Sequence, residues 1–313
     1  MGGGGGGNPF RGRSPEQLAR LVREAEDEGG TREFEVSVSG LMNDLLSAAN
    51  SRDNELVADR LEDIKESLKG PLEGTVDTLF GGSVAKHTYV DGMSDVDSLL
   101  ILDDSALAEE APSEAIQRVA EIVRRDLPEG VEVTTGRLAI TVEYPDGMQI
   151  QLLPALRKDG NLKIPSSRRD DWSRIAPESF QRALSDRNAE CGGKLVPTIK
   201  LAKAIIGRLP ESQRLTGYHV ESLAIDVFRN YDGQKTTAAM LPEFFDRGRE
   251  LVMRPIRDRT GQSIHVDDYL GAEGSSERVN ASHVLSRISK RMRNASAHGS
   301  LDQWRALFGF DDE

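Results

Sequence analysis

Two short motifs in the first third of the chain combine residue types that suit phosphate chemistry. The first is a Gly-Gly-Ser turn at residues 81–83, and the second is Asp95-Val96-Asp97, which follows after eleven further residues. Side chains two apart on a strand point to one face and lie roughly 6–7 Å apart, so the two carboxylates would converge. Two adjacent carboxylates repel each other unless a divalent cation lies between them, and Mg²⁺ favours such a site.

The turn complements the paired carboxylates. Gly82 and Ser83 offer unhindered backbone N–H groups and a hydroxyl at the start of a short helix, where anions bind readily. Mg²⁺, with Mn²⁺ as a substitute, would bridge a triphosphate there, which suits nucleotidyl transfer. Each motif alone is a weak signal, because D-x-D is often a solvated strand end and G-G-S an ordinary turn. Their joint order favours a metal–triphosphate site.

The elements that must position these motifs follow from hydrophobic periodicity and turn residues. Apolar alternation and turn signals predict strands at 76–80, 95–102, 131–135, 137–144 and 148–153. Spacings of three and four, with capping residues, predict helices at 14–28, 36–49, 53–68, 115–127, 194–209, 217–230, 236–253, 282–297 and 302–307. The segment 254–274 is predicted to be irregular. The order is helices, then a mixed sheet, then a helical half, which is an α/β (α+β) fold.

Composition limits the function classes. The 313 residues are 37 % hydrophobic and 29 % charged, which is typical of a folded protein, and no apolar run reaches membrane-spanning length. The net charge of −12 should repel long nucleic acid and favours small substrates. The single cysteine, Cys191, excludes an internal disulfide and a zinc site built on several thiolates. The glycine-rich start has no signal-peptide pattern, so we expect a cytoplasmic protein.

Several motifs resemble those of a known family. The run Gly82-Ser83 … Thr88 … Ser94–Asp97 resembles the signature of the polymerase-β-like nucleotidyltransferases. The resemblance narrows to the bacterial cGAS/DncV-like nucleotidyltransferases (CD-NTases) through further motifs, which are QLLPA at 151–155, LTGYHVESL at 215–223, DRTGQS at 258–263 and VDDYL at 266–270. It covers about residues 35 to 295.

The resemblance implies a two-lobed enzyme with its active site between the lobes. Residues 1–13 would be a flexible tail, 14–190 the catalytic lobe with N-terminal helices, and 191–313 a helical lobe that completes the nucleotide pocket. Such enzymes join ATP, GTP or other nucleoside triphosphates into a cyclic di- or oligonucleotide in bacterial antiphage (CBASS) signalling. The product activates an effector, and CBASS accessory proteins are possible partners. With no zinc module, activation by long duplex DNA is not expected.

One position departs from the family pattern. The family places a third carboxylate on the neighbouring strand, where this chain has Gln151. An amide is no general base and binds a cation more weakly than a carboxylate does. Glu143, across the predicted hairpin from Gln149 and Gln151, is the candidate for the missing catalytic acid, and a surface glutamate is the alternative. The substitution leaves open a nucleotide-binding pseudoenzyme or regulator. A nucleotidyltransferase that acts on RNA or protein is the other alternative.

The helical half supplies further candidates by resemblance. Lys200 and Lys203 would share one helix face, and Lys203 is the first choice for a triphosphate contact; a solvated lysine is the alternative. Tyr218 resembles an aromatic residue that stacks on a base, and a core tyrosine is the alternative. His219 and His265 are expected to make structural hydrogen bonds. Asp267-Asp268 is expected to be a loop or capping feature, with a metal role left open. A basic run near the C-terminus is expected to be a solvated helix face, and contact with a partner protein is the alternative. Its residues are Arg287, Lys290, Arg291 and Arg293.

Overall fold

The described strands form one mixed, seven-stranded sheet. The computed structural model describes residues 32–47, 54–72, 75–80, 96–103, 106–158, 161–166, 170–261 and 263–310. The strand order is β1-β2-β5-β4-β3, with β6 paired to β5 and β7 to β6. The strands are β1 (Thr75–Phe80), β2 (Val96–Asp103), β3 (Glu132–Thr135), β4 (Ile140–Glu143), β5 (Gln149–Lys158), β6 (Asn161–Pro165) and β7 (Trp172–Ile175). Only β2 and β5 run parallel among them, so the mixed sheet that the sequence predicts is confirmed.

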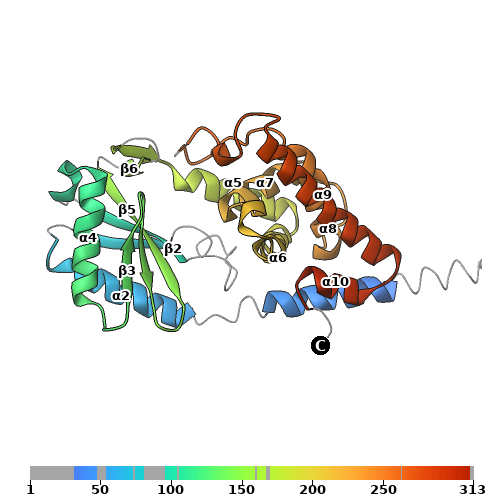
Figure 1. The fold of residues 1–313 in the computed structure, drawn as a ribbon, viewed down its shortest axis with the longest axis horizontal. Helices are drawn as coiled ribbons and strands as arrows, with labels where there is room; N and C mark the ends of the chain where they lie inside the picture. The colour runs from blue at the N-terminus through green and yellow to red at the C-terminus, as the bar shows by residue number, and fades with distance from the viewer. Residues whose placement is uncertain are drawn as a thin grey trace, which may run out of the picture.

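Helices α2 (Asn54–Lys69) and α4 (Pro112–Asp126) cover one face of the sheet, at the end of the molecule away from the helical half (Figure 1). Their apolar residues form one core with Leu100 and Leu102 of β2 and with Ile150 and Leu152 of β5. Leu99 and Ile101, which alternate with Leu100 and Leu102 along β2, belong to a smaller apolar cluster on the other face of the sheet. An apolar strand with no polar alternation is typical of a strand buried on both faces.

The hairpin between β4 and β5 is anchored to α2. Gly147 has a φ of +83°, the conformation that the turn requires, and the Tyr144 N–H donates to the Met148 carbonyl at 2.9 Å. Arg60 of α2 donates to both carboxylate oxygens of Asp146, at 3.0 and 2.8 Å, and its guanidinium lies 3.9 Å from the Tyr144 ring centroid. Hydrogen bonds from Arg60 lower the pKa of Asp146. This anchor fixes the register of the two strands that carry Glu143 and Gln151.

The second half of the molecule is a helical lobe with its own apolar core. It contains α5 (Pro177–Glu190), α6 (Leu195–Gly207), α7 (Gly217–Val227), α8 (Thr237–Leu251), α9 (Ser276–Ala297) and α10 (Leu301–Leu307). The side chains of Thr216, Thr236, Ser275 and Ser300 each accept a hydrogen bond from the backbone N–H three residues on, which starts four of these helices. Within the described residues, no helix has the length and apolar character to cross a bilayer.

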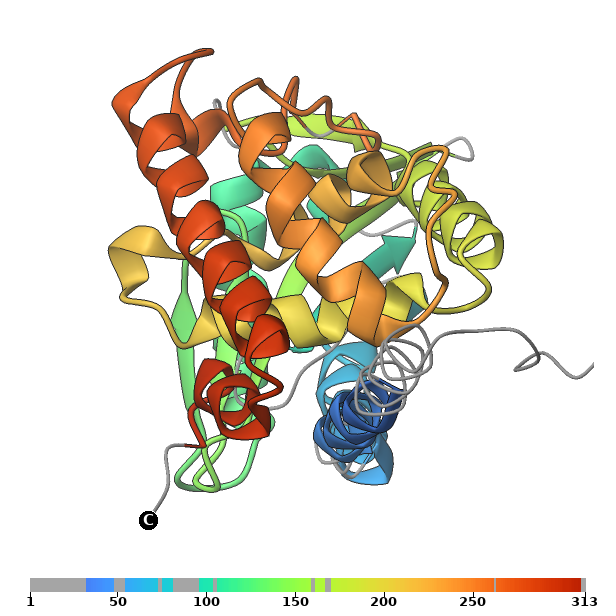
Figure 2. The ribbon, with the colours of Figure 1, turned by 90° about the vertical axis from the view of Figure 1, so that its right-hand side faces the viewer.

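The helix at residues 32–47 packs with this lobe rather than with the sheet. Val38 and Met42 are buried in the same core as α6 to α10. Both views show this helix, coloured blue, along the lower edge of the helical half (Figures 1 and 2). Phe180 and Leu184 of α5 belong to that core as well. Residues on both sides of the boundary expected at 190 therefore contribute to the helical core.

Most predicted elements match the observed ones within a few residues. The helix predicted at 282–297 begins six residues earlier, at Ser276, because Ser275 caps it. The strand predicted at 137–144 begins at Ile140, after a turn in which the Gly136 N–H donates to the Ala139 carbonyl. The sequence did not indicate β6, β7 or α5. The predicted helix at 14–28, the turn at 81–83 and the short helix expected directly after that turn lie outside the described residues.

Candidate active site

The strand register gives Gln151 the position beside Asp97. Asp97 lies in β2, and its Cα partner in the parallel strand β5 is Gln151, whose Cα partner on the far side is Thr141 in β4. The Gln151 side chain is half-buried. Asp95, Gly82 and Ser83 lie outside the described residues. The amide at 151 is therefore next to one member of the candidate carboxylate pair.

Glu143 lies further from β2. Its Cα partner is Gln149, and the Gln149 Nε2 donates to the Glu143 Oε2 at 3.1 Å. Strand β5 separates it from β2, and two interstrand spacings of about 4.8 Å put roughly 10 Å between the backbones. The Glu143 side chain is exposed. Its role as the third acid stays a prediction, and Gln151 is the residue that directly neighbours Asp97.

The donor set at this edge of the sheet consists of oxygens. Carboxylate and amide oxygens are ligands that a hard cation such as Mg²⁺ accepts. In the part of the chain that the structure describes, no three His, Cys, Asp or Glu side chains are placed to hold a metal. A magnesium site would therefore depend on Asp95 together with Asp97. Gln151 would offer a neutral amide oxygen at the same edge of the sheet.

Lys203 is nearly buried and forms an ion pair. Its Nζ lies 2.7 Å from the Glu221 Oε1, and the two side chains are 5 % and 2 % exposed. A Cβ at Gly217 would lie 3.4 Å from the same Nζ, so the ammonium sits against the first turn of α7. Gly217 itself is exposed. A cation beneath an exposed helix start is an arrangement that favours anions.

Lys200 lies on the same helix, α6, and is half-buried. Burial lowers its pKa, and the charge of Lys203 lowers it further. A phosphate nearby would oppose that effect, since an anion favours the charged ammonium. The two lysines thus carry positive charge close together, as the three-residue spacing predicts.

Tyr218 is fixed by the Asp258 carboxylate. Its hydroxyl donates to the Asp258 Oδ1 at 2.7 Å, and its ring lies 4.8 Å from the Phe180 ring at 54°. Burial and the Asp258 carboxylate raise the pKa of Tyr218. The tyrosine is half-buried. The Phe180 ring and the Asp258 carboxylate help to hold it, and base stacking remains a prediction.

Asp258 organises the irregular segment after α8. Besides Tyr218, it accepts hydrogen bonds from the backbone N–H and the hydroxyl of both Thr260 and Ser263, at 2.7 to 2.9 Å. Burial would raise the pKa of Asp258, but the bonds from Thr260 and Tyr218 outweigh it and lower the pKa. The D-x-T-G-x-S motif is thus a local carboxylate-centred turn. The sequence showed this motif only as a resemblance, and Asp–Thr and Asp–Ser spacing is the signal that could have indicated the turn.

Asp267 is part of a buried network behind α7. Its carboxylate lies 2.7 Å from the Arg278 Nη1 and accepts from the Ile256 N–H at 3.0 Å, and both charged side chains are fully buried. His219 Nδ1 lies 2.8 Å from the Tyr269 hydroxyl, which also accepts from the Thr216 N–H. These contacts agree with the structural hydrogen bond expected for His219. Asp267, expected to be a loop or capping feature, instead forms a buried ion pair, and its side chain does not cap the short helix that follows.

The neighbouring residues agree with the sequence as well. His265 Nδ1 lies 3.2 Å from the Asp268 Oδ1, which is the structural hydrogen bond expected for His265. The basic run Arg287, Lys290, Arg291 and Arg293 is exposed on α9. Arg287 donates to Gln213 and Arg293 pairs with Asp246.

The comparison that decides the family concerns the sheet half and the helices before it. Residues 37–188 match the family model of the Second Messenger Oligonucleotide or Dinucleotide Synthetase (SMODS) domain. This part of the chain is similar to a SMODS domain. The match includes the Gly-Gly-Ser turn, the Asp-Val-Asp motif, Glu143 and Gln151. No curated protein matches the sequence significantly.

Solved structures share the fold of this protein over both halves. The CD-NTase CdnG from Bradyrhizobium diazoefficiens, solved with GTP, has a TM-score of 0.66 at 16 % identity, covering 88 % of this chain and 95 % of its own. CdnC from E. coli, solved with a HORMA protein, has a TM-score of 0.63 at 14 % identity, covering 80 % and 90 %. Vibrio cholerae DncV, a cyclic AMP-GMP synthase solved with a linear intermediate, has a TM-score of 0.62 at 10 % identity, covering 95 % and 91 %.

These matches confirm the resemblance to the CD-NTases and the fold that it implied. The SMODS match ends at residue 188, within α5, and the likeness of the solved structures continues through the helical lobe. The matched family model describes a domain that synthesises oligonucleotide or dinucleotide second messengers.

Proposed function

We propose that this protein is a Mg²⁺-dependent nucleotidyltransferase that joins nucleoside triphosphates into a cyclic di- or oligonucleotide and releases pyrophosphate. The observation that carries the proposal is the family match over residues 37–188, which spans the Gly-Gly-Ser and Asp-Val-Asp motifs. The register of β2 and β5 supports it, because Asp97 lies beside the strand position where the family keeps its third acid.

Asp95 and Asp97 are the residues that would hold Mg²⁺, or Mn²⁺ in its place. A cation bound there would neutralise triphosphate charge and lower the pKa of the attacking ribose hydroxyl. Gly82 and Ser83 would cradle the β- and γ-phosphates through backbone N–H groups and the hydroxyl. The ribose oxygen attacks the α-phosphorus in line, and the bond to the pyrophosphate oxygen breaks on the opposite side.

The helical lobe would complete the nucleotide pocket. Lys203, held at the start of α7 by Glu221, is proposed to contact the triphosphate together with Lys200. Tyr218 would stack on a base, which is worth roughly 1–3 kcal/mol. The hydrogen bond from its hydroxyl to Asp258 fixes the ring in place and lowers the ordering cost of that contact.

Gln151 sets the strength of the metal site. With a neutral amide beside Asp97, the site has less negative charge than one with three carboxylates, so it binds a second cation more weakly. We therefore expect a high requirement for divalent cation. The Glu143 carboxylate, two residues along β4 from Thr141, the Cα partner of Gln151, is proposed as the acid that offsets part of this loss.

The relatives suggest the setting in which such an enzyme works. E. coli CdnC was solved with a HORMA protein, and DncV is a cyclic AMP-GMP synthase. By analogy we propose that this chain acts in bacterial antiphage signalling in the cytoplasm, with an accessory protein and with an effector that binds its cyclic product.

The test is to incubate the protein with all four NTPs and Mg²⁺ or Mn²⁺, and to measure pyrophosphate and phosphatase-resistant products. We expect both with wild type and neither with the Asp95→Ala/Asp97→Ala variant. Nucleotide binding without turnover would instead support a nucleotide-binding regulator. Gln151 is the residue that favours this alternative, because it replaces the third carboxylate. Product that persists in the double variant would contradict the site.

A further inference from the structure

Two adjoining pockets lie on the helical lobe, where α7 and α8 end and the irregular segment begins. Their volumes are about 440 and 540 Å³, which is the size of small-molecule sites. They share Asp226, Arg229 and Arg257. Among the described residues, none of those proposed for nucleotidyl transfer lines either pocket.

Positive charge dominates the lining of these two pockets. Five arginines, from three different segments, line them, namely Arg229, Arg247, Arg254, Arg257 and Arg259. The carboxylates that line them are Asp226 and Asp258. Asp258 already accepts five hydrogen bonds from its own turn and from Tyr218. In a chain with a net charge of −12, such a cluster is a local exception.

The five arginines outnumber the two carboxylates of the lining, and of the five only Arg247 and Arg254 pair with described carboxylates outside it, Glu243 and Glu273. Both Arg229 and Arg259 bind the same oxygen of Asp226, at 2.5 and 2.7 Å. The Arg257 guanidinium is exposed and makes no hydrogen bond or ion pair to any residue that the structure describes. The Nη1 of Arg259 is buried and has no acceptor among those residues. A buried, unsatisfied donor is unfavourable and points to an absent water or ligand oxygen.

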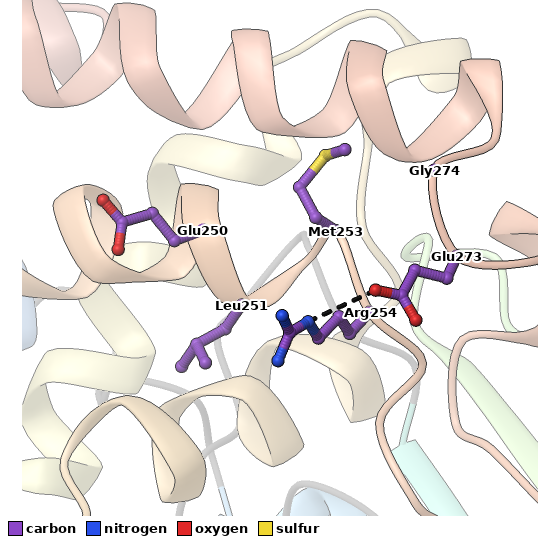
Figure 3. A pocket seen from close by; sticks show the side chains of 6 residues that line it. All are labelled: Glu250, Leu251, Met253, Arg254, Glu273 and Gly274. Atoms are coloured by element: carbon purple, nitrogen blue, oxygen red, sulfur yellow. Dashed lines mark ion pairs between the residues drawn. The ribbon is translucent and has the colours of Figure 1, made fainter.

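The positive region ends at the next pocket. That pocket shares Leu251 and Arg254 with the first, but Glu250 and Glu273 line it as well. Figure 3 shows Arg254 joined there to Glu273, with Nε 3.3 Å from Oε1. A long polyanion that followed the surface would meet these two carboxylates. The occupant of the basic pockets should therefore be compact.

We propose that the two basic pockets bind a small molecule that carries two or more linked phosphate groups. Guanidinium groups bind phosphate and carboxylate oxygens in pairs, but a carboxylate accepts donors in one plane. Phosphates accept hydrogen bonds from several directions. This matches the arginines of the two pockets, which lie just after α7, on α8 and in the segment at 254–259.

The test is isothermal titration calorimetry of the full chain with sodium tripolyphosphate, in EDTA so that metal-dependent binding is absent. We expect one binding event in wild type. Arg229→Gln/Arg257→Gln should weaken it roughly tenfold or more, because each lost charged hydrogen bond is worth about 1.5–3 kcal/mol. Arg257→Gln alone should weaken it too, and since that exposed side chain makes no hydrogen bond or ion pair to a described residue, the fold should survive the change.

Arg305→Gln is the matched control, because Arg305 is a half-exposed arginine on α10 that pairs with one aspartate. It should leave the affinity unchanged. Absence of wild-type binding, or equal affinity in the Arg229→Gln/Arg257→Gln variant, would overturn the proposal. Binding of citrate as tight as that of tripolyphosphate would overturn the assignment to phosphate.

Discussion

Gln151 pairs with Asp97 across two parallel strands, so a single side chain at 151 controls the charge next to the candidate metal pair. The strand register supports a simple expectation about this position. A carboxylate there would add a hard, charged ligand without moving the backbone, whereas the natural amide supplies only a neutral oxygen.

Gln151→Glu should lower the Mg²⁺ concentration that gives half-maximal turnover by roughly tenfold, since an added carboxylate binds a hard cation more strongly than an amide. A metal titration of initial rates measures this. Gln149→Glu is the matched control, because it makes the same change two residues away, next to Glu143. An unchanged or higher metal requirement in Gln151→Glu would argue against a cation beside residue 151.

The Lys203–Glu221 pair should be sensitive to loss of one partner. Lys203→Met leaves the Glu221 carboxylate buried without its cation and should cost about 3–5 kcal/mol in the free energy of unfolding. Lys203→Met/Glu221→Leu should recover most of that loss, because apolar side chains replace a buried ion pair at little net cost. Urea unfolding measures both values.

Lys69→Met, which breaks an exposed pair with Glu66 on α2, should change the free energy of unfolding far less, because solvent screens an exposed ion pair. If the Lys203→Met/Glu221→Leu variant is stable yet has a raised KM for NTP, Lys203 contacts the nucleotide. A stable variant with unchanged KM would restrict Lys203 to a structural role.

At the scale of elements, α7 is the helix on which the candidate pocket depends. The Thr216 side chain caps it, and Tyr269 binds both the Thr216 N–H and His219. Behind it, Asp267 and Arg278 tie the irregular segment to α9. These contacts of the irregular segment thus stabilise the first turn of α7, which carries Tyr218.

The burial of His219 among these contacts predicts that the stability of the fold depends on pH. Burial lowers the pKa of His219 from 6.5 to about 4, with Arg278 also lowering it and Asp267 opposing. Between these two values, His219 stays neutral in the folded protein but is protonated in the unfolded chain. Its contribution to the free energy of unfolding is therefore complete above pH 6.5 and is lost as the pH falls to about 4.

Wild type should lose on the order of 3 kcal/mol more than His219→Asn over that pH range, because asparagine does not titrate. Chemical unfolding of both proteins at intervals from pH 7 to pH 4 measures the difference. Parallel curves for the two proteins would show that His219 is not held neutral.

Much of the fold could be predicted from local patterns, and the contacts between helices could not. Long periodic segments gave α4, α6, α7 and α8, and the apolar run at 99–102 gave the central strand. Strands β6 and β7 were missed because they are only five and four residues long, and α5 because few of its residues are apolar. Asp97 and Gln151 could be placed on neighbouring strands from their motifs, whereas Lys203–Glu221 and Tyr218–Asp258 depend on packing across 18 and 40 residues.

At the scale of the whole molecule, two apolar cores divide the chemistry between two halves. The sheet half carries Asp97 and Gln151, and the helical half carries Lys203 and Tyr218. A protein with a net charge of −12 repels a triphosphate at long range, so binding should require both the cation and the local lysines. The two aspartates at 95 and 97 are therefore the point on which the whole account depends.

The most direct measurement is anomalous diffraction from crystals grown with Mn²⁺ and a non-hydrolysable NTP analogue. The account predicts a manganese peak bound by both carboxylates, Asp95 and Asp97, with the triphosphate of the analogue against Gly82 and Ser83. A nucleotide bound elsewhere, or two carboxylates that diverge with no manganese between them, would contradict it.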